Sequence, residues 1–220
     1  MHYIFVVNCR SDKGIILEEV EKQTVSIQVS YEIYKTEGPG DATRFVNIYC
    51  DLHPKDEVCF VACGGAGTLN EVVTGLVGKE NKYLAVLSWT GTNDFIKCFP
   101  GKTFQSVDAM LKGEVKPVDV IKVNDNYAIN CVNVGMDAMV ATLATSYSEM
   151  NESRPYDKGM LEAVLFHRYN KIRLVADGEV LSSRRMLMST ISNGQWTGGE
   201  FHCAPDAVVD DGLLNVCFIK

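Results

Sequence analysis

A glycine-rich turn between an apolar run and an amphipathic stretch is the strongest chemical feature of the sequence. Gly64, Gly65, Gly67 and Thr68 follow the apolar residues 60–62. Glycines let a backbone approach a ligand closely, and the free N–H groups of a helix N-terminus attract anions, phosphate above all. The pattern predicts a strand, a phosphate-binding turn and a helix, in which Thr68 caps the helix or binds a phosphate oxygen. A tight turn without a ligand is the alternative.

Two familiar nucleotide-binding motifs do not fit this turn. The glycines are not spaced as G-x-G-x-x-G, and no GK[ST] follows them. Neither dinucleotide binding of the Rossmann type nor P-loop chemistry is therefore indicated.

Two later blocks carry residue types that phosphoryl transfer uses. Thr90-Gly91-Thr92-Asn93-Asp94-Phe95 is the first, and Ala204-Pro205-Asp206-Ala207 with Asp210-Asp211-Gly212-Leu213-Leu214 is the second. Phosphoryl transfer needs a phosphate cradle, a divalent cation held by carboxylates, and a base or positioning group. The structural alternatives are a helix cap at Asn93 and Asp94 and a plain turn at residues 210–212.

Together the three blocks resemble the diacylglycerol kinase and sphingosine kinase catalytic domain. Residues 64–68 with Glu71 are similar to its GGDGT-x-x-E motif, residues 90–95 to GTGNDF, and the late block to AP-x-A-x-x-DDG-x-L. The resemblance implies a lipid kinase that uses ATP and Mg²⁺ to phosphorylate the hydroxyl of diacylglycerol or a related lipid alcohol. NAD kinases share only the first block, so a NAD kinase is a remoter alternative.

The resemblance also assigns roles to single residues. It implies that Asp94 and Asp119 help to hold Mg²⁺, although Asp119 has an ion pair with Lys116 or Lys122 as its alternative. Near Asn8 the family pattern is only partly kept, because Cys9 and Asp12 replace a proline and a glycine. The implied nucleotide-binding residues are Asn8, Thr36, Gly64, Gly65, Gly67, Thr68, Glu71, Thr90, Thr92 and Asn93.

Two departures from the family pattern bear on activity. Ala66 stands where the family has an aspartate, and an alanine cannot coordinate a cation or accept a proton. Family members also run tens of residues beyond the strand that ends at Lys220, and the proposed general base lies in that segment. Asp177-Gly178-Glu179 has similar letters but the wrong position, and we interpret it as a hairpin turn. No catalytic residue is named, and a relative that binds nucleotide or lipid without turnover is the alternative function.

Apolar patterning up to about residue 112 alternates between strands and helices. Strands are expected at 3–7, 29–35, 60–62 and 84–87, and helices at 15–24, from about 38 to 52, and at 104–111. Such alternation implies right-handed βαβ units and a parallel sheet with helices on both faces. Asn8, Thr36, Gly64 and Thr90 then fall at carboxyl ends of strands, the edge where open α/β sheets bind ligands.

The pattern becomes strand-rich near Val115. Strands are expected at 116–123, 127–134, 172–175, 185–192 and 213–219, with a turn at 124–126 and a loop at 196–199 that lines an acyl pocket or ends a hairpin. We therefore predict an α/β ATP-binding domain over 1–113 and a mainly antiparallel β domain over 114–220, with a helical insert at about 136–169.

Composition restricts the partners and the compartment. The 220 residues carry a net charge of −7, which argues against nucleic-acid binding. The eight cysteines form no C-x-x-C pair and predict free thiols of a reducing cytoplasm. A lipid substrate implies a protein peripheral to the inner face of the membrane, and the basic residues at 167–173 and 184–185 are either a solvated face or a patch that attracts anionic headgroups. Whether the chain forms a homodimer is left open.

Overall fold

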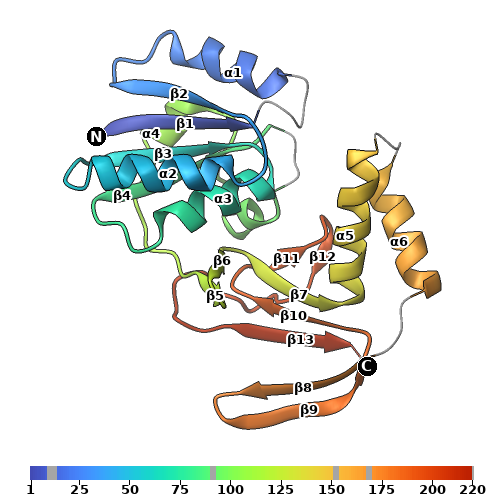
Figure 1. The fold of residues 1–220 in the computed structure, drawn as a ribbon. Coiled ribbons are helices and arrows are strands. Elements are labelled where there is room, and N and C mark those ends of the chain that lie inside the picture. Colours follow the sequence, from blue (N-terminus) through green and yellow to red (C-terminus); the bar gives the residue numbers. More distant parts are fainter. Residues whose placement is uncertain (9–13, 90–92, 151–153, 167–169, 220) are drawn as a thin grey trace. The chain divides into compact units, whose positions relative to one another are not determined.

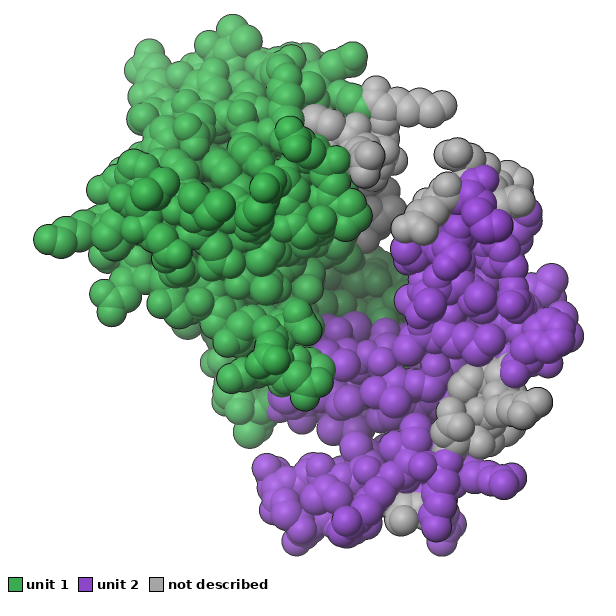
Figure 2. Space-filling view, in the orientation of Figure 1, with its two compact units in different colours: residues 1–130, 193–213 green, residues 131–192, 214–220 purple. Residues whose placement is uncertain are grey.

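The computed structural model describes residues 1–8, 14–89, 93–150, 154–166 and 170–219. The chain divides into two compact units, coloured separately in Figure 2. Unit 1 comprises Met1–Asn130 and Asn193–Leu213, and unit 2 comprises Cys131–Ser192 and Leu214–Lys220. This division groups residues 193–213 with the N-terminal part, which the apolar pattern of the sequence did not indicate. The predicted domain boundary between residues 113 and 114 stays a prediction.

A four-stranded parallel sheet in the order β2-β1-β3-β4 forms the centre of unit 1 (Figure 1). The predicted α/β class with a parallel sheet is confirmed. The strands are β1 (His2–Asn8), β2 (Tyr31–Thr36), β3 (Val58–Cys63) and β4 (Lys82–Leu87). The helices are α1 (Ile15–Thr24), α2 (Asp41–Leu52), α3 (Ala66–Leu76) and α4 (Val107–Leu111), with a 3₁₀ helix, η1, at Phe95–Cys98.

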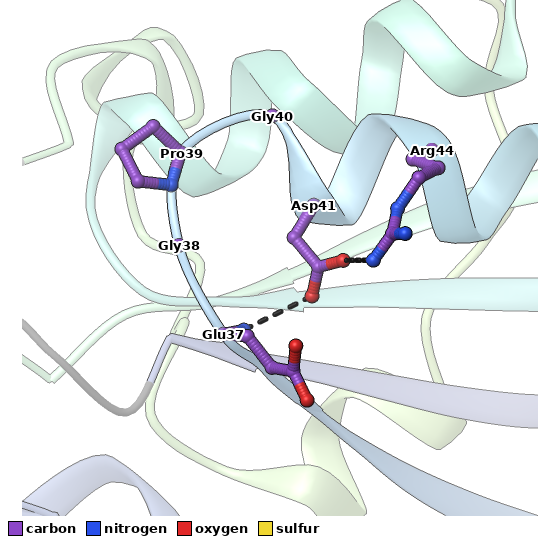
Figure 3. A pocket seen from close by; sticks show the side chains of 6 residues that line it. All are labelled: Glu37, Gly38, Pro39, Gly40, Asp41 and Arg44. Carbon is purple, nitrogen blue, oxygen red and sulfur yellow. Dashed lines mark hydrogen bonds and ion pairs between the residues drawn. The ribbon is translucent and has the colours of Figure 1, made fainter.

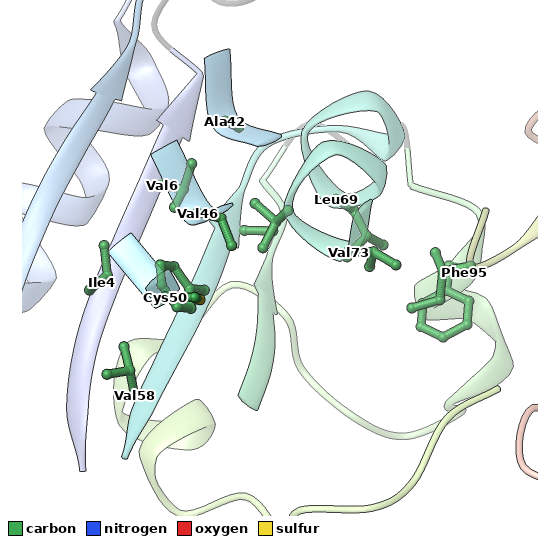
Figure 4. Packing of buried hydrophobic residues seen from close by; sticks show 13 residues of the cluster. Ile4, Val6, Ala42, Val46, Cys50, Val58, Leu69, Val73 and Phe95 are labelled. Carbon is green, nitrogen blue, oxygen red and sulfur yellow. The ribbon is translucent and has the colours of Figure 1, made fainter. Parts of the chain in front are cut away.

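Both faces of this sheet are buried, because successive side chains of a strand point to opposite faces. On one face Val6 and Phe60 pack with α2 and α3, and Figure 4 shows Val46, Leu69 and Val73 over the strands. On the other face Phe5 and Val61 pack with residues of α1 and α4. Near-continuous apolar strands such as β3 follow from this double burial.

Short antiparallel pairs complete unit 1. They are β5 (Ile121–Val123) with β6 (Asn126–Ala128), and β11 (Trp196–Thr197) with β12 (Phe201–His202). The expected strand at 116–123 is reduced to its last three residues, and the expected strand at 127–134 is interrupted. The side-chain amide of Asn193 donates to Ile129 O at 2.9 Å, and its backbone N–H donates to Asn130 O, which ends strand pairing there.

Unit 2 is built from antiparallel strands and a pair of helices. The strands β7 (Cys131–Gly135), β10 (Met188–Ser192) and β13 (Asn215–Ile219) form one sheet in the order β13-β10-β7, and β8 (Asn170–Ala176) pairs with β9 (Glu179–Met186). Helices α5 (Met136–Glu149) and α6 (Pro155–Phe166) lie between β7 and β8 in the chain. The predicted antiparallel second part is confirmed.

Three local predictions are corrected or refined. The helix expected at 104–111 begins only at Val107, because the Ser106 side chain accepts from Ala109 N and caps it. The strand expected at 185–192 is two strands, and Leu187 between them pairs instead with Ile219 and Met136. The predicted turn at Asp177 and Gly178 is confirmed, with φ values of 49° and 84°.

The cysteines of the described segments form no disulfide bond with one another. Burial raises the pKa of Cys59 to about 12 and that of Cys63 well above its ordinary value, so both thiols stay protonated at neutral pH. None of the described helices is long and apolar enough to cross a bilayer.

Close packing of α2 on α3 predicts that Gly75→Ala is destabilising. A Cβ at Gly75 would lie 2.7 Å from Val46 Cβ, and overpacking costs about 1–3 kcal/mol against a helix-propensity gain of roughly 1 kcal/mol. Urea unfolding should show a net loss of about 1 kcal/mol. Gly67→Ala, whose Cβ meets nothing within 4 Å, is the control and should lose nothing. Equal stability of the two variants would contradict the packing argument.

Candidate nucleotide-binding site

The parallel sheet brings three predicted site residues to one edge. Asn8 ends β1 and is the register partner of Thr36, which ends β2. Cys63, the last residue of β3, is the register partner of Val7, the residue before Asn8. Gly64 follows Cys63 in the chain and therefore comes level with Asn8. Adjacent parallel strands that end in the same layer leave their carboxyl ends side by side, which is where ligands bind in open α/β sheets.

Helix α3 begins directly at the glycine turn. Gly65 is its N-cap residue in an extended conformation, and no side chain caps the helix. Thr68 lies inside the first turn, so the proposed capping role of Thr68 is wrong. The first N–H groups of a helix have no intrahelical acceptor, and the positive end of the helix dipole favours an anion there.

Gly64 and Gly67 have different reasons to lack a side chain. A Cβ at Gly64 would lie 2.6 Å from Thr68 Oγ1, so internal packing alone requires glycine there. A Cβ at Gly67 would meet no described atom within 4 Å. The space beside Gly64 is therefore filled by Thr68, whereas the space beside Gly67 is open, and a ligand has room to approach the backbone there.

The two threonine hydroxyls at this edge have partners within the sheet and the turn. Asn8 Nδ2 donates to Thr68 Oγ1 at 3.3 Å, and Thr36 Oγ1 donates to Val7 O at 3.3 Å. Both threonines are buried. These bonds tie the ends of β1, β2 and the glycine turn together and fix the orientation of the hydroxyl groups.

Glu71 has a structural role that the sequence did not indicate. Its Oε1 accepts from Gly40 N at 2.9 Å, and its Oε2 accepts from Ala42 N at 3.2 Å. Thr43 Oγ1 also donates to the Glu71 carbonyl oxygen at 2.8 Å. A carboxylate at the N-terminus of α2 is favoured by the unpaired N–H groups and the helix dipole. Glu71 thus positions the loop between β2 and α2, and its direct contact with nucleotide stays a prediction.

That loop lines a pocket of about 390 Å³, open to solvent (Figure 3). Arg44 Nη2 lies 2.5 Å from Asp41 Oδ1, and this hydrogen bond is the main reason why the pKa of Asp41 lies below its ordinary value. Glu37 N donates to the other oxygen of Asp41 at 3.0 Å. The pocket follows Thr36 directly and is lined by Glu37, Gly38, Pro39, Gly40, Asp41 and Arg44.

Asn93 is buried with an unsatisfied side chain. It is 1% exposed, and neither its Oδ1 nor its Nδ2 has a partner among the described residues. Ser88, just after β4, is likewise buried, and its Oγ lacks a described partner. A buried polar group without a hydrogen bond costs about 1–3 kcal/mol, which makes both groups natural contacts for a ligand or water. Ser88 was missed because a single serine after a strand carries no motif.

The carboxylate of Asp94 is held on both oxygens. Lys97 Nζ lies 2.7 Å from Oδ1, and Gly199 N donates to Oδ2 at 2.9 Å. Lys97 also donates to the carbonyl oxygen of Gly199 and lies over the ring of Trp196. Asp94 makes no side-chain cap to η1, so the capping alternative is wrong, and the carboxylate instead anchors the loop after β11.

Asp119 is tied to the late block of the sequence. Its Oδ2 accepts from Gly212 N at 2.7 Å, and its backbone N–H donates to Val209 O. Within the described segments it forms no ion pair with Lys116 or Lys122, so that alternative is wrong. Gly212 has φ of 72°, a left-handed turn conformation that favours glycine.

The metal site and the remaining nucleotide contacts stay predictions. No three histidine, cysteine or carboxylate side chains of the described residues gather where a metal could bind. Mg²⁺ is commonly held by one or two carboxylates together with waters and substrate phosphates, so Asp94 and Asp119 remain candidates. Thr90 and Thr92 lie outside the described residues.

Fold and site together define an α/β protein whose sheet edge suits a phosphate-bearing ligand. The model of the diacylglycerol kinase catalytic domain matches residues 2–123, and the YegS C-terminal NAD kinase beta sandwich-like domain matches residues 130–220. The chain belongs to the diacylglycerol kinase catalytic domain family.

Two curated relatives agree with this assignment. A probable lipid kinase YegS-like protein of Serratia proteamaculans is 29% identical over 89% of this chain and 63% of its own length. A diacylglycerol kinase of Staphylococcus aureus is 29% identical over 98% of this chain and 69% of its own. The chain thus spans about two thirds of their length.

The fold is shared with a diacylglycerol kinase of Bacillus anthracis, at a TM-score of 0.72 and 23% identity, over 100% of this chain and 73% of that one. Another solved structure from the same organism gives a TM-score of 0.75, also at 23% identity, and covers 100% of this chain and 75% of that one.

Capping of α2 by Glu71 predicts that Glu71→Gln lowers the free energy of unfolding. A glutamine offers one acceptor oxygen, and its amide group then faces a second N–H donor. Loss of a cap costs about 0.5–2 kcal/mol, and urea unfolding should show a loss in that range. Glu114→Gln removes the same charge at an exposed position and should change stability by less than about 0.5 kcal/mol. Equal behaviour of the two variants would remove the capping role.

Proposed function

We propose that the chain is a lipid kinase that transfers the γ-phosphoryl group of ATP to the hydroxyl of a lipid alcohol such as diacylglycerol. The observation that carries this proposal is the glycine turn, which opens at Gly67 onto the N-terminus of α3. Membership of the family supports a kinase-type phosphotransferase. The relatives' names support a lipid acceptor, and the particular lipid is part of the proposal.

The described residues fit ATP at the sheet edge. Phosphate oxygens would accept hydrogen bonds from the first N–H groups of α3, and the open space at Gly67 admits them. The buried amide of Asn93 has both hydrogen-bonding atoms available for the nucleotide. Arg44, two-thirds exposed at the loop pocket, could turn to a phosphate, although its charge is balanced by the ion pair with Asp41. These features do not depend on a carboxylate at position 66.

Mg²⁺ would neutralise charge on the transferred phosphoryl group and fix the geometry of the phosphates. Asp94 and Asp119 are the carboxylates proposed to hold it, through water where they do not reach it directly. Lys97 sets the position of the Asp94 carboxylate and would itself attract the phosphates. The contacts of Asp119 with Gly212 fix its carboxylate in the same way. We name no residue of this chain as the general base.

A second candidate function is a relative that binds nucleotide or lipid with little turnover. Ala66 favours it, because the family aspartate at this position contributes to the cation network. A NAD kinase is the remoter candidate. Block 90–95 argues against it, since the NAD kinases lack that block.

A lipid acceptor would place the working enzyme at a membrane surface. We propose that the chain acts in the cytoplasm, peripheral to the inner face of the membrane. Nucleic acid is not proposed as a partner, because a net charge of −7 repels phosphate backbones. A homodimer is compatible with this function and is not required by it.

Nucleotide binding is tested with Gly67→Leu. A Cβ at position 67 would meet no described atom within 4 Å, and the rest of the leucine side chain would enter the space proposed for the phosphates. Calorimetry should show ATP affinity lowered at least about tenfold, equivalent to about 1.4 kcal/mol. Ala141→Leu, which adds a similar side chain at an exposed position of α5, is the control and should bind normally. Unchanged ATP affinity in Gly67→Leu would show that the turn is not the site.

Turnover is tested with Ala66→Asp and with the C-terminal segment that the longer relatives have. A protein of residues 1–220 alone should phosphorylate diacylglycerol slowly, because the Ala66 side chain cannot support the cation and because the resemblance implies a general base outside these residues, which would contribute about 10²- to 10⁴-fold. Ala66→Asp alone should recover little of the rate, and the added segment alone should recover part of it. The two changes together should recover most of the rate, because effects within one catalytic unit are not additive.

The measurement is the rate of phosphatidic acid formation from radiolabelled ATP by the four proteins. A rate of about 1–100 s⁻¹ for the unmodified chain, typical of kinases, would show that neither feature is needed. NAD offered as the acceptor in the same assay should give no product above background.

A further inference from the structure

Two cysteine thiols meet at the backbone of one residue in unit 1. The Sγ of Cys98, the last residue of η1, accepts a hydrogen bond from Gln195 N at 3.4 Å. The Sγ of Cys203, directly after β12, donates to Gln195 O at 3.6 Å. Only three covalent bonds separate the N and O atoms of one residue, so the two sulfur atoms lie at the two ends of a single short stretch of backbone.

The backbone between the two thiols is held in place. Gln195 O also accepts a hydrogen bond from Ala204 N at 3.2 Å. A Cβ at Gly194 would lie 3.2 Å from Cys98 Sγ, so this stretch packs directly against the end of η1. Cys203 is buried and Cys98 is half-buried. Both side chains are therefore turned toward the same fixed residue.

The Cys98 thiol also lies close to the carboxylate of Asp94. Burial is the main reason why the pKa of Cys98 lies above its ordinary value, and negative charge on Asp94 or on the Cys203 sulfur raises that pKa further. The Cys98 thiol is therefore protonated at neutral pH. The three side chains lie within electrostatic reach of one another, which places the thiol pair beside a candidate metal ligand.

Two other uses of paired thiols fit these residues less well. A nucleophilic cysteine has a lowered pKa, whereas burial raises that of Cys98. A structural zinc site takes four ligands, and no three histidine, cysteine or carboxylate side chains gather among the residues that the structure describes.

We propose that Cys98 and Cys203 form a reversible disulfide bond when a peroxide is present, and that this bond locks residues 193–203 onto η1. In a reducing compartment such a bond is transient, as in redox sensors. The formation of the bond does not depend on the proposed function, whereas its effect on the metal site, described below, rests on that function.

Hydrogen peroxide supplies the oxidising equivalents. The sulfur of Cys98, the more exposed of the two thiols, attacks one peroxide oxygen, and the O–O bond breaks. This step gives a sulfenic acid and one water, which carries the thiol proton. The Cys203 sulfur then attacks the Cys98 sulfur, the S–O bond breaks, and the hydroxyl group leaves as a second water with the Cys203 proton. Two thiols are oxidised, and one peroxide is reduced to two waters.

The disulfide would restrain the proposed metal site. Asp94 lies four residues before Cys98, and its carboxylate accepts from Gly199 N in the loop before β12. A bridge from Cys98 to Cys203 therefore ties the two segments that carry this hydrogen bond and holds Gly199 near Asp94. A cation would then compete with an N–H donor that cannot move away. The oxidised protein should bind Mg²⁺ more weakly than the reduced protein.

The bond is tested by treating the reduced chain with hydrogen peroxide and mapping its peptides by mass spectrometry. A linked pair of peptides that contains Cys98 and Cys203, about 2 Da lighter than the two thiol peptides together, should appear and should vanish with dithiothreitol. Cys98→Ser and Cys203→Ser should each abolish it. Their hydroxyl groups can keep the hydrogen bonds with Gln195, so folding should be retained.

The control is the double variant Cys131→Ser with Cys217→Ser, at half-buried positions of unit 2. It should form the linked peptides as the unmodified chain does. A sulfinic acid at Cys98 without linked peptides would overturn the proposal. A bridge between other cysteines as the main product would overturn it as well.

Hydrogen exchange and urea unfolding report on the lock without any activity. Exchange over residues 193–203 should slow when the unmodified chain is oxidised. The urea midpoint should rise, because the bond closes a long loop in the unfolded chain. Neither quantity should change in Cys98→Ser. Equal exchange in the oxidised and reduced forms would show that the bond does not lock this segment.

Phosphorylation assays distinguish this proposal from the proposed kinase activity. The oxidised chain should need about fivefold or more Mg²⁺ for its half-maximal rate, and dithiothreitol should reverse the change. A disulfide without any lipid phosphorylation would remove the kinase function and leave the redox-sensitive pair. Phosphorylation by a chain that forms no disulfide would remove the pair and leave the kinase. The same Mg²⁺ dependence in both forms would overturn the effect on the metal site.

Discussion

The burial of β1 between β2 and β3 is the constraint on which the rest of unit 1 depends. A strand covered on both faces and paired on both edges holds its register, because a shift by one residue would exchange the side chains packed in the two cores, where each fits neighbours of a particular size and shape. The ends of β1, β2 and β3 are thereby held in one layer. The proposed nucleotide site consists of residues at these strand ends and directly after them. Its geometry is therefore set by the packing of the apolar core.

Helix α3 connects this core to the chemistry. The first N–H groups of α3 have no intrahelical acceptor, and its middle supplies Glu71, whose carboxylate holds the start of α2. One turn further, Gly75 lets α2 approach closely. The glycine turn and the loop pocket after β2 are therefore attached to the same rigid helix. A change in how α2 packs would move both sides of the proposed nucleotide site together.

Much of the fold could be predicted from local patterning, whereas the partners of polar side chains could not. The bounds of α1 and the parallel order of the first strands follow from apolar periodicity, and Asp177-Gly178 follows from turn chemistry. The motifs located the glycine turn, Asp94 and Asp119. They did not indicate that Glu71 caps α2 or that Lys97 and Gly199 hold Asp94, because these contacts join residues that are far apart in sequence or lack a pattern.

The two candidate metal-binding carboxylates share a property that changes how such a site would work. Asp94 and Asp119 each bind a backbone N–H of the segment 193–213, at Gly199 and Gly212 respectively. A cation that approached either carboxylate would weaken those bonds, because a positive charge competes with an N–H donor for the same oxygen. Lys97 competes for Asp94 in the same way, with a charge of its own. Cation binding at the proposed metal site would therefore be coupled to the position of residues 193–213, and the loop after β11 would respond to the charge at that site.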